Sequence, residues 1–186
     1  GTLNYLSIPA IKIGIDHIRA IGMHAVHLRV RLLTEYLLEQ LTALRHSNGQ
    51  PMVHIFGPQS MENRGGTIIL NILSQEGEPV PYLTTQAEAN KAKISLRTGC
   101  FCNPGIDEVN HHLEIQDIEE YFKFYERQTY EQYVNFIGHL RGAVRISLGY
   151  ISNFHDVFRF IRFCNSFKDI TFQRSTLTTC DIEFKK

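Results

Sequence analysis

The 186-residue sequence has few cysteines, no excess of charge and no long hydrophobic run. Four cysteines are too few for a disulfide framework in a chain of this length, which favours a reducing compartment, most simply the cytoplasm. Nineteen basic residues balance nineteen acidic ones, so the net charge indicates neither a nucleic acid nor an anionic membrane as partner. The lack of a long apolar run, or of a basic and then apolar leader, argues against a membrane span or a signal peptide.

The composition that is present is that of an ordinary globular protein, with 43% hydrophobic and 20% charged residues. A chain of this length buries about 70% of its unfolded surface, so it needs neither disulfides nor a metal in order to fold. The sequence opens on Gly1-Thr2-Leu3-Asn4, not on methionine, and these residues resemble the interior of a sequence. We therefore expect the chain to be part of a longer protein.

Hydrophobic periodicity predicts two helices near the start. Apolar residues recur at helical spacing from Ile8 to Ile21, and again over a longer stretch from about His24 to His46. Asn48-Gly49 is expected to end the second helix, because both residues tolerate the left-handed conformation common after a helix.

Four short apolar segments, within residues 52–58, 66–73, 94–97 and 142–150, predict strands. The last of them alternates apolar residues with Arg145 and Ser147, which is typical of a strand buried on one face. Helices are expected at 84–94, capped by Thr84 or Thr85, and after an Asn153 cap. Short, mainly antiparallel strands with helices packed on one face indicate the α+β class.

The motif SLRTGCFCNPG, from Ser95 to Gly105, places two cysteines one residue apart. A zinc site completed by His111 and His112 would lack ligands and the usual cysteine spacing, so we predict no metal. A disulfide between Cys100 and Cys102 would be strained. The local sequence leaves two interpretations open: a nucleophilic thiol presented on a loop, or two small buried hydrophobic side chains.

Two arginines are candidate binding residues. Arg97 is close enough to the cysteines in sequence to stabilise a thiolate. Arg145 lies in an otherwise apolar strand, where its guanidinium could pair with an internal carboxylate, bind the carboxylate of a ligand in two-point contact, or point outward to solvent. The pattern alone does not choose among these roles.

Three stretches together resemble a known family. They are GTLNYLSIPAI..GI, SLRTGCFCNPG and GAVRISLGY.S...DV..F..F, and they cover the chain from Gly1 to about Phe163 in the expected order. This combination resembles the C-terminal portion of the cysteine-desulfurase-like group of class V aminotransferases, and most of all the molybdenum cofactor sulfurase type, for which TGCFCNPG is characteristic. Any one motif alone would be a weak signal.

The resemblance implies the fold of type I pyridoxal-phosphate enzymes, in which a small α+β domain closes over a large cofactor-binding domain. It divides the chain into linking helices from the end of the large domain (1–46), a small α+β domain (47–168) with a helical insert at about 107–140, and a C-terminal tail (169–186). The tail is expected to be extended and could form an edge strand. Homodimers with sites at the subunit interface are also implied.

Carried over by motif, Cys102 corresponds to the thiol that receives the sulfur as a persulfide, and Cys100 to a helper or to no role. Arg145 corresponds to the arginine that binds the substrate carboxylate, and Arg97 to one beside the substrate and the loop base. Thr2 corresponds to a residue that reaches the cofactor phosphate of the neighbouring subunit. The implied substrate is an amino acid, with L-cysteine favoured; the sulfur acceptor is not indicated.

The chain departs from the family in one respect. The lysine that holds pyridoxal phosphate as a Schiff base belongs upstream of the Gly-Thr pair, and none of the seven lysines here has such a context. We therefore expect the chain alone to be inactive. Two alternatives stay open: another class V reaction, such as that of a lyase or an aminotransferase, and a non-catalytic sulfur-carrier or interaction module.

Overall fold

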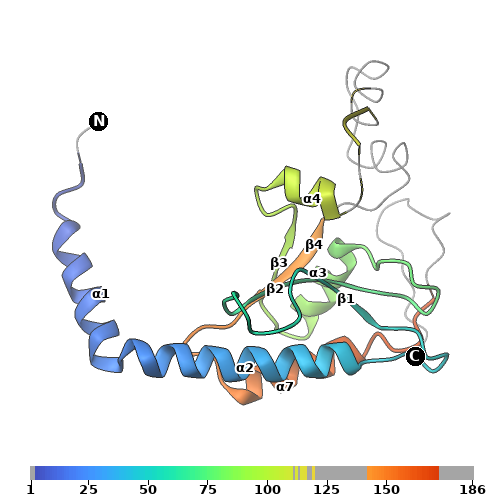
Figure 1. The fold of residues 1–186 in the computed structure, drawn as a ribbon, viewed down its shortest axis with the longest axis horizontal. Helices are drawn as coiled ribbons and strands as arrows, with labels where there is room; N and C mark the ends of the chain where they lie inside the picture. Colours follow the sequence, from blue (N-terminus) through green and yellow to red (C-terminus); the bar gives the residue numbers. More distant parts are fainter. Residues whose placement is uncertain (1–2, 111, 113, 117–118, 120–141, 172–186) are drawn as a thin grey trace.

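The computed structural model describes residues 3–110, 112, 114–116, 119 and 142–171 (Figure 1). Helices pack against a four-stranded antiparallel sheet, which confirms the α+β prediction. Among the described residues, no helix is long and apolar enough to cross a membrane.

Two helices begin the chain, as predicted. Helix α1 (Ile8–Ile21) points away from the rest of the structure and buries none of its residues (Figure 1). Helix α2 (Met23–Ala43) runs alongside the sheet and buries Leu37, Leu38 and Leu41. Gly22, at a φ of 89°, forms the elbow between the two helices, a conformation that glycine adopts at little cost.

The predicted end of α2 was wrong. The helix ends at Ala43, and Leu44 is already extended. Asn48-Gly49 lies instead in a turn beyond the helix, where Arg45 and Pro51 form a β-bridge and the Gly49 amide donates to the His46 carbonyl over 3.0 Å. The left-handed glycine therefore reverses the chain between the helix and the first strand.

The strands lie in the order β1-β2-β4-β3, and each neighbouring pair is antiparallel. Their bounds are β1 (Val53–Phe56), β2 (Thr67–Ile72), β3 (Arg97–Gly99) and β4 (Ala143–Ser147). Strand β3 starts later than the predicted segment 94–97. The reason is that the Ile94 amide still donates to the Ala89 carbonyl of the preceding helix, over 2.8 Å.

Helices α3 and α7 differ in how their first turns are stabilised. Helix α3 (Tyr82–Lys91) begins at Pro81 with no side-chain cap, so the predicted threonine cap was wrong. Helix α7 (Phe154–Asn165) has the predicted Asn153 cap, and Asp156 completes a reciprocal capping box with distances of 3.0 and 3.1 Å. Caps of this kind contribute about 1 kcal/mol.

One face of the sheet forms the core, and the described residues of the other, the open face, are mostly exposed or half-buried, with Asn71 and Ala143 buried. The core face carries alternate residues of the strands, packed against α2, α3 and α7; its strand residues are Val53, Ile55, Ile68, Leu70, Ile72, Val144 and Ile146. The open face includes exposed or half-buried His54, Thr67, Arg145 and Ser147. A shift of the strands by one residue would exchange the two faces, so burial of the core face sets the register.

Parts of three predictions lie outside the described residues. The motif leads into the short helix α4 (Pro104–Asn110), but most of the predicted insert at 107–140 and the extended tail beyond Thr171 are not described. Thr2 also lies outside them. The domain boundaries remain predictions.

Asp169 joins the end of α2 to the end of α7. Its two carboxylate oxygens accept hydrogen bonds from the amide and the hydroxyl of Ser47, over 2.7 and 2.6 Å. Its own amide donates to Nδ1 of the buried His46 over 2.9 Å, so the ring carries its proton on Nε2, which donates to the Leu73 carbonyl. The bonds from Ser47 lower the pKa of Asp169.

Asp169→Asn should therefore lower the melting temperature at neutral pH. A carboxyl group with a lowered pKa stabilises the fold above its ordinary pKa, near 3.8, and this contribution is lost as the pH falls through the lower native value. The difference from the parent chain should thus be largest near pH 7 and shrink below pH 4. Asp16→Asn, which removes an exposed ion pair with Lys12, is the control and should change little. Equal melting temperatures of Asp169→Asn and the parent chain at pH 7 would contradict this role.

Candidate functional site

A row of four side chains crosses the open face of the sheet. The strand registers pair Phe56 with Ile69, Ile69 with Arg145, and Arg145 with Arg97. The row thus changes from apolar on β1 and β2 to cationic on β4 and β3. The structure brings together Arg97 and Arg145, which the sequence offered only as separate candidates.

The two arginines lie directly opposite each other, a placement that destabilises a sheet when the charges are alike. Arg145 is half-buried, and its Nε atom is fully buried, with no hydrogen-bond partner among the described residues. No acidic side chain among the described residues forms an ion pair with either guanidinium. A buried, unsatisfied donor beside a second cation is suited to an anion, and the planar fork of arginine matches a carboxylate.

The two exposed cysteines lie in a tight turn that follows β3. The Asn103 amide donates to the Cys100 carbonyl over 3.0 Å, which closes the turn. Both central residues are left-handed, Phe101 at a φ of 55° and Cys102 at 58°, as in a type I′ turn. Glycine, asparagine and aspartate normally occupy these positions, so each of the two residues here stores strain on the order of 1–3 kcal/mol.

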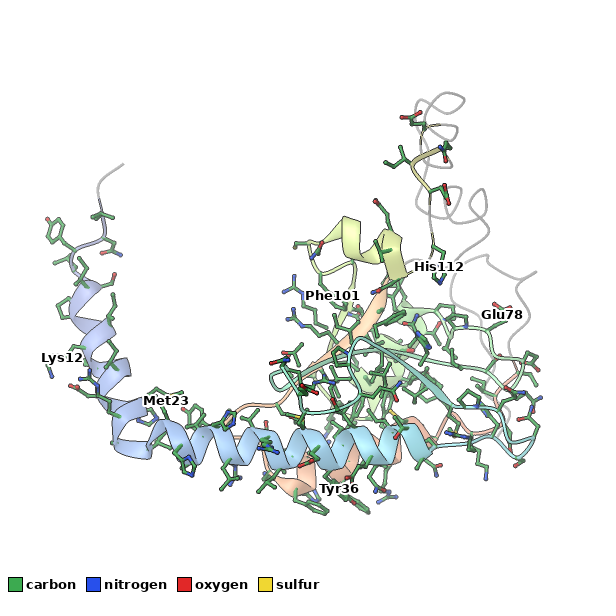
Figure 2. All side chains as sticks on the ribbon, in the orientation of Figure 1. Lys12, Met23, Tyr36, Glu78, Phe101 and His112 are labelled. Atoms are coloured by element: carbon green, nitrogen blue, oxygen red, sulfur yellow. The ribbon has the colours of Figure 1, made fainter. Side chains whose placement is uncertain are left out.

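Two contacts join this turn to the arginines. Arg97 Nη2 lies 3.7 Å from the Sγ atom of Cys102, in position to donate to it. The guanidinium carbon of Arg145 lies 5.4 Å from the centre of the Phe101 ring, within the range of a cation–π interaction worth about 0.5–2 kcal/mol. Figure 2 shows Phe101 at the end of the sheet, beside α4. Sequence reasoning missed Phe101, since a phenylalanine between two cysteines carries no signal of a left-handed turn.

The base of the turn is tightly packed. Gly142 precedes β4 at a φ of 82°, and a Cβ atom there would lie 2.9 Å from the Tyr82 ring and 3.2 Å from the Gly99 Cα. Thr98 donates to the Gln86 side chain of α3 over 2.6 Å. These contacts place the start of the turn at a fixed position on α3 and β4.

The other cysteine described, Cys164, has a different environment. It lies fully inside the core on α7, and burial raises the pKa of its thiol. Such a thiol stays protonated and inert, whereas Cys100 and Cys102 are exposed. The described residues contain no group of three potential metal ligands; His111, part of the zinc alternative, lies outside them.

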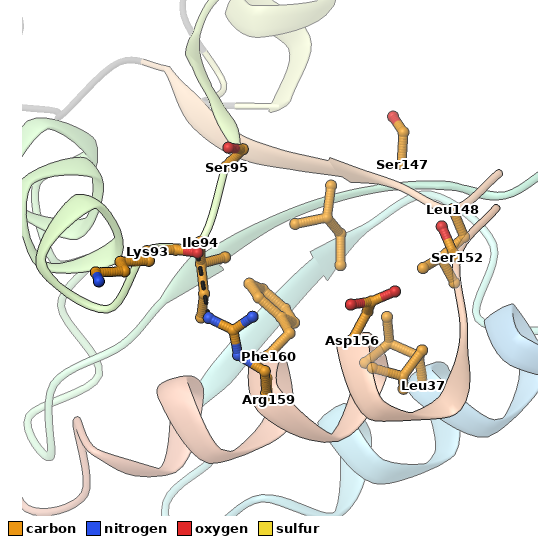
Figure 3. Close-up of a pocket in the computed structure, with 12 residues that line it drawn as sticks. Leu37, Lys93, Ile94, Ser95, Ser147, Leu148, Ser152, Asp156, Arg159 and Phe160 are labelled. Atoms are coloured by element: carbon orange, nitrogen blue, oxygen red, sulfur yellow. Dashed lines mark hydrogen bonds between the residues drawn. The ribbon is translucent and has the colours of Figure 1, made fainter.

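A separate cleft of about 220 Å³ opens on the core side of the sheet (Figure 3). It lies between the end of β4, the start of α7 and the Lys93–Ser95 segment. Arg159 crosses it and donates to the carbonyls of Ala92 and Lys93, over 3.0 and 3.2 Å, which ties α7 to the end of α3. Neither the turn nor the arginine pair lines this cleft. We therefore place the candidate site on the open face.

Comparison with known proteins shows what the chain is similar to. No protein-family model matches the chain. The chain is 32% identical over 171 residues to the molybdenum cofactor sulfurase of Arabidopsis thaliana, and 34% identical over 169 residues to that of Bos taurus. Each alignment covers 88% of this chain. The chain is homologous to part of the molybdenum cofactor sulfurases. It spans about one fifth of the length of these two sulfurases, with coverages of 20% and 19%.

Solved structures show the same fold for this sulfurase-like segment. A cysteine desulfurase from Thermococcus onnurineus superimposes with a TM-score of 0.53 at 17% identity, covering 80% of this chain and 27% of that one. A cysteine desulfurase from Escherichia coli gives 0.55 at 11% identity, covering 90% and 31%. The resemblance drawn from the motifs is confirmed. The roles of Cys102, Arg97, Arg145 and Thr2 remain predictions.

Replacing one arginine of the pair should stabilise the sulfurase-like segment. Arg97→Gln removes the like-charge repulsion with Arg145, so the free energy of unfolding should rise by about 0.5 kcal/mol at low salt. The gain should shrink in high salt, which screens the repulsion in the parent chain. Urea unfolding at two salt concentrations measures both effects.

Arg19→Gln, an exposed substitution on α1, serves as the control for the loss of one positive charge. It should leave the free energy of unfolding within a few tenths of a kcal/mol of the parent value. A loss of stability in Arg97→Gln at low salt would show that Arg97 has a stabilising partner beyond the Cys102 sulfur, and would contradict the interpretation of the pair as an open anion site.

Proposed function

We propose that this sulfurase-like segment supplies the sulfur-accepting thiol and the carboxylate clamp of a pyridoxal-phosphate-dependent cysteine desulfurase or sulfurase. The observation that carries the proposal is the arginine pair, Arg97 and Arg145, without a carboxylate partner among the described residues and beside the exposed thiol of Cys102. The molybdenum cofactor sulfurases that the chain resembles support this choice of chemistry.

The clamp determines which substrates fit. Arg145 offers a partly buried guanidinium that can hold a carboxylate by two parallel hydrogen bonds, and Arg97 adds a second charge from the opposite strand. The apolar Ile69 lies next to Arg145 in the same row. An amino acid held here by its carboxylate would have its remaining atoms next to the turn that carries Cys102. L-Cysteine is the substrate we favour.

The net reaction assigns one covalent step to this chain. The Cys102 thiolate attacks the sulfur of the bound cysteine, and the bond between that sulfur and the substrate Cβ breaks. The sulfur stays on Cys102 as a persulfide, and the Cβ takes up a proton to give alanine. The Arg97 guanidinium lies 3.7 Å from the Cys102 sulfur before the substrate binds, and the attack itself uses the deprotonated sulfur.

The described residues can bind the substrate, but they include no lysine placed to anchor the cofactor. Pyridoxal phosphate supplies the electron sink for breaking the carbon–sulfur bond when it is bound. Lys12 pairs with Asp16 on α1 and Lys91 pairs with Glu88 on α3, and no lysine among the described residues contacts the turn or the arginine pair. The anchoring lysine would thus come from another part of the enzyme. The contact of Thr2 with the cofactor phosphate, the homodimer and the cytoplasmic location are parts of this proposal that rest on the resemblance.

The activity is testable in a chimera that carries this chain in place of the matching segment of the Arabidopsis thaliana sulfurase. With L-cysteine added, alanine and protein persulfide are measured. Cys102→Ala should lower both by at least about 100-fold, since the attacking group is lost, while Cys100→Ala should stay largely active. Arg145→Lys should raise KM by about tenfold or more through loss of the two-point contact. Full activity in Cys102→Ala with loss in Cys100→Ala would overturn the assignment.

A non-catalytic sulfur carrier is the second candidate, because the described residues include no anchoring lysine at the site. In that case the chain alone would take up sulfur on Cys102 from a separate persulfide donor, with no cofactor added, and the chimera would form no alanine. Another class V reaction would leave turnover intact in Cys102→Ala and abolish it in Arg145→Ala.

A further inference from the structure

We propose that Phe101 is a latch that couples occupation of the arginine pair to the position of Cys102. The inference rests on the proposed function, since it takes the arginine pair to be a carboxylate site. Phe101 is a positioning residue: it acts on the thiol through the turn and through Arg145, and has no contact of its own with the reacting sulfur.

The first step is that a single backbone hydrogen bond, from the Asn103 amide to the Cys100 carbonyl, closes a turn whose two central residues are strained. Phe101 and Cys102 both occupy the left-handed region, which their side chains disfavour. Gly99, at a φ of 104°, precedes the turn, and α4 begins right after it at Pro104. In the proposed latch, the segment between these two points reorients while the sheet and α4 stay in place.

The second step is that, within the described part of the chain, the contacts of these two side chains with charged groups both involve the arginine pair. Arg145 lies over the Phe101 ring at 5.4 Å, and Arg97 lies 3.7 Å from the Cys102 sulfur. Both contacts are made by a positively charged guanidinium, with the face of the ring in one case and with the sulfur atom in the other.

The third step is the effect of a carboxylate. An anion bound between Arg145 and Arg97 neutralises the charges that hold the ring and the sulfur, so both contacts weaken together. The stored strain then favours an open turn, in which Phe101 leaves Arg145 and Cys102 can move toward the substrate. Substrate binding itself would release the nucleophile, and an empty site would keep it against Arg97.

The latch can be tested on the 186-residue chain by the rate of alkylation of each cysteine with iodoacetamide, a neutral reagent, resolved by mass spectrometry. Acetate is the carboxylate probe, and chloride at equal ionic strength is the reference. In the parent chain, acetate should lower the Cys102 rate at least twofold, because the open turn takes the thiol away from Arg97. The Cys100 rate should change less.

Two substitutions separate the effect of the Phe101 ring on the alkylation rate from the effect of the backbone strain. Phe101→Leu removes the ring and keeps the strain, so the turn should be open from the start: the Cys102 rate should be at least twofold below that of the parent chain and insensitive to acetate. Phe101→Asn removes the ring but places a residue that tolerates the left-handed conformation at this position. The alkylation rate of Cys102 should therefore match that of the parent chain and should not change when acetate is added. Phe158→Leu, an exposed phenylalanine on α7, is the matched control and should behave as the parent chain does.

The outcomes distinguish the latch from the clamp. Acetate binding, followed by NMR titration, should be lost in Arg145→Gln. If acetate binds but leaves the alkylation rate of Cys102 unchanged, the latch is overturned and the carboxylate clamp stands. The same conclusion follows if Phe101→Leu has the alkylation rate of the parent chain and the same response to acetate. No acetate binding to the parent chain would overturn the clamp, and the latch with it.

Discussion

Two arginines that face each other across β3 and β4 are the constraint on which the site depends. Their positions follow from the opposite face of the sheet, where the buried residues of β2 and β4 pack against α2 and α7. A shift of β4 by one residue would carry Arg145 into the core, where an unpaired charge is prohibitive. The apolar packing therefore holds the charged pair in place.

The molecule separates stable parts from strained ones. The core face, the Asn153 capping box and the Asp169–Ser47 hydrogen bonds stabilise the fold away from the site. In the part of the chain that the structure describes, one turn and one strand pair hold like charges, a buried guanidinium nitrogen without a partner and two left-handed residues. Local conflicts of this kind concentrate where a protein binds or reacts, because the rest of the fold carries their cost.

Much of this arrangement was predictable from the sequence. Periodicity gave both N-terminal helices, alternation placed Arg145 on a half-buried strand, and Asn153 marked the start of α7. The remainder depended on contacts between distant residues. The pairing of Arg97 with Arg145 is a tertiary register, β3 was delayed by a hydrogen bond back to α3, and the conformation of Phe101 contradicts its own preference. No local pattern encodes these features.

The chain matches about one fifth of the length of the Arabidopsis thaliana molybdenum cofactor sulfurase. The central claim is therefore that the arginine pair binds a carboxylate, and it does not extend to the whole enzyme. A crystal structure of the chain with L-alanine, the product of the proposed reaction, would test it most directly. The account predicts the alanine carboxylate bound between Arg145 and Arg97, with hydrogen bonds of about 2.7–2.9 Å to Arg145. An Arg145 paired with a carboxylate of the chain itself, and no alanine at the pair, would contradict it.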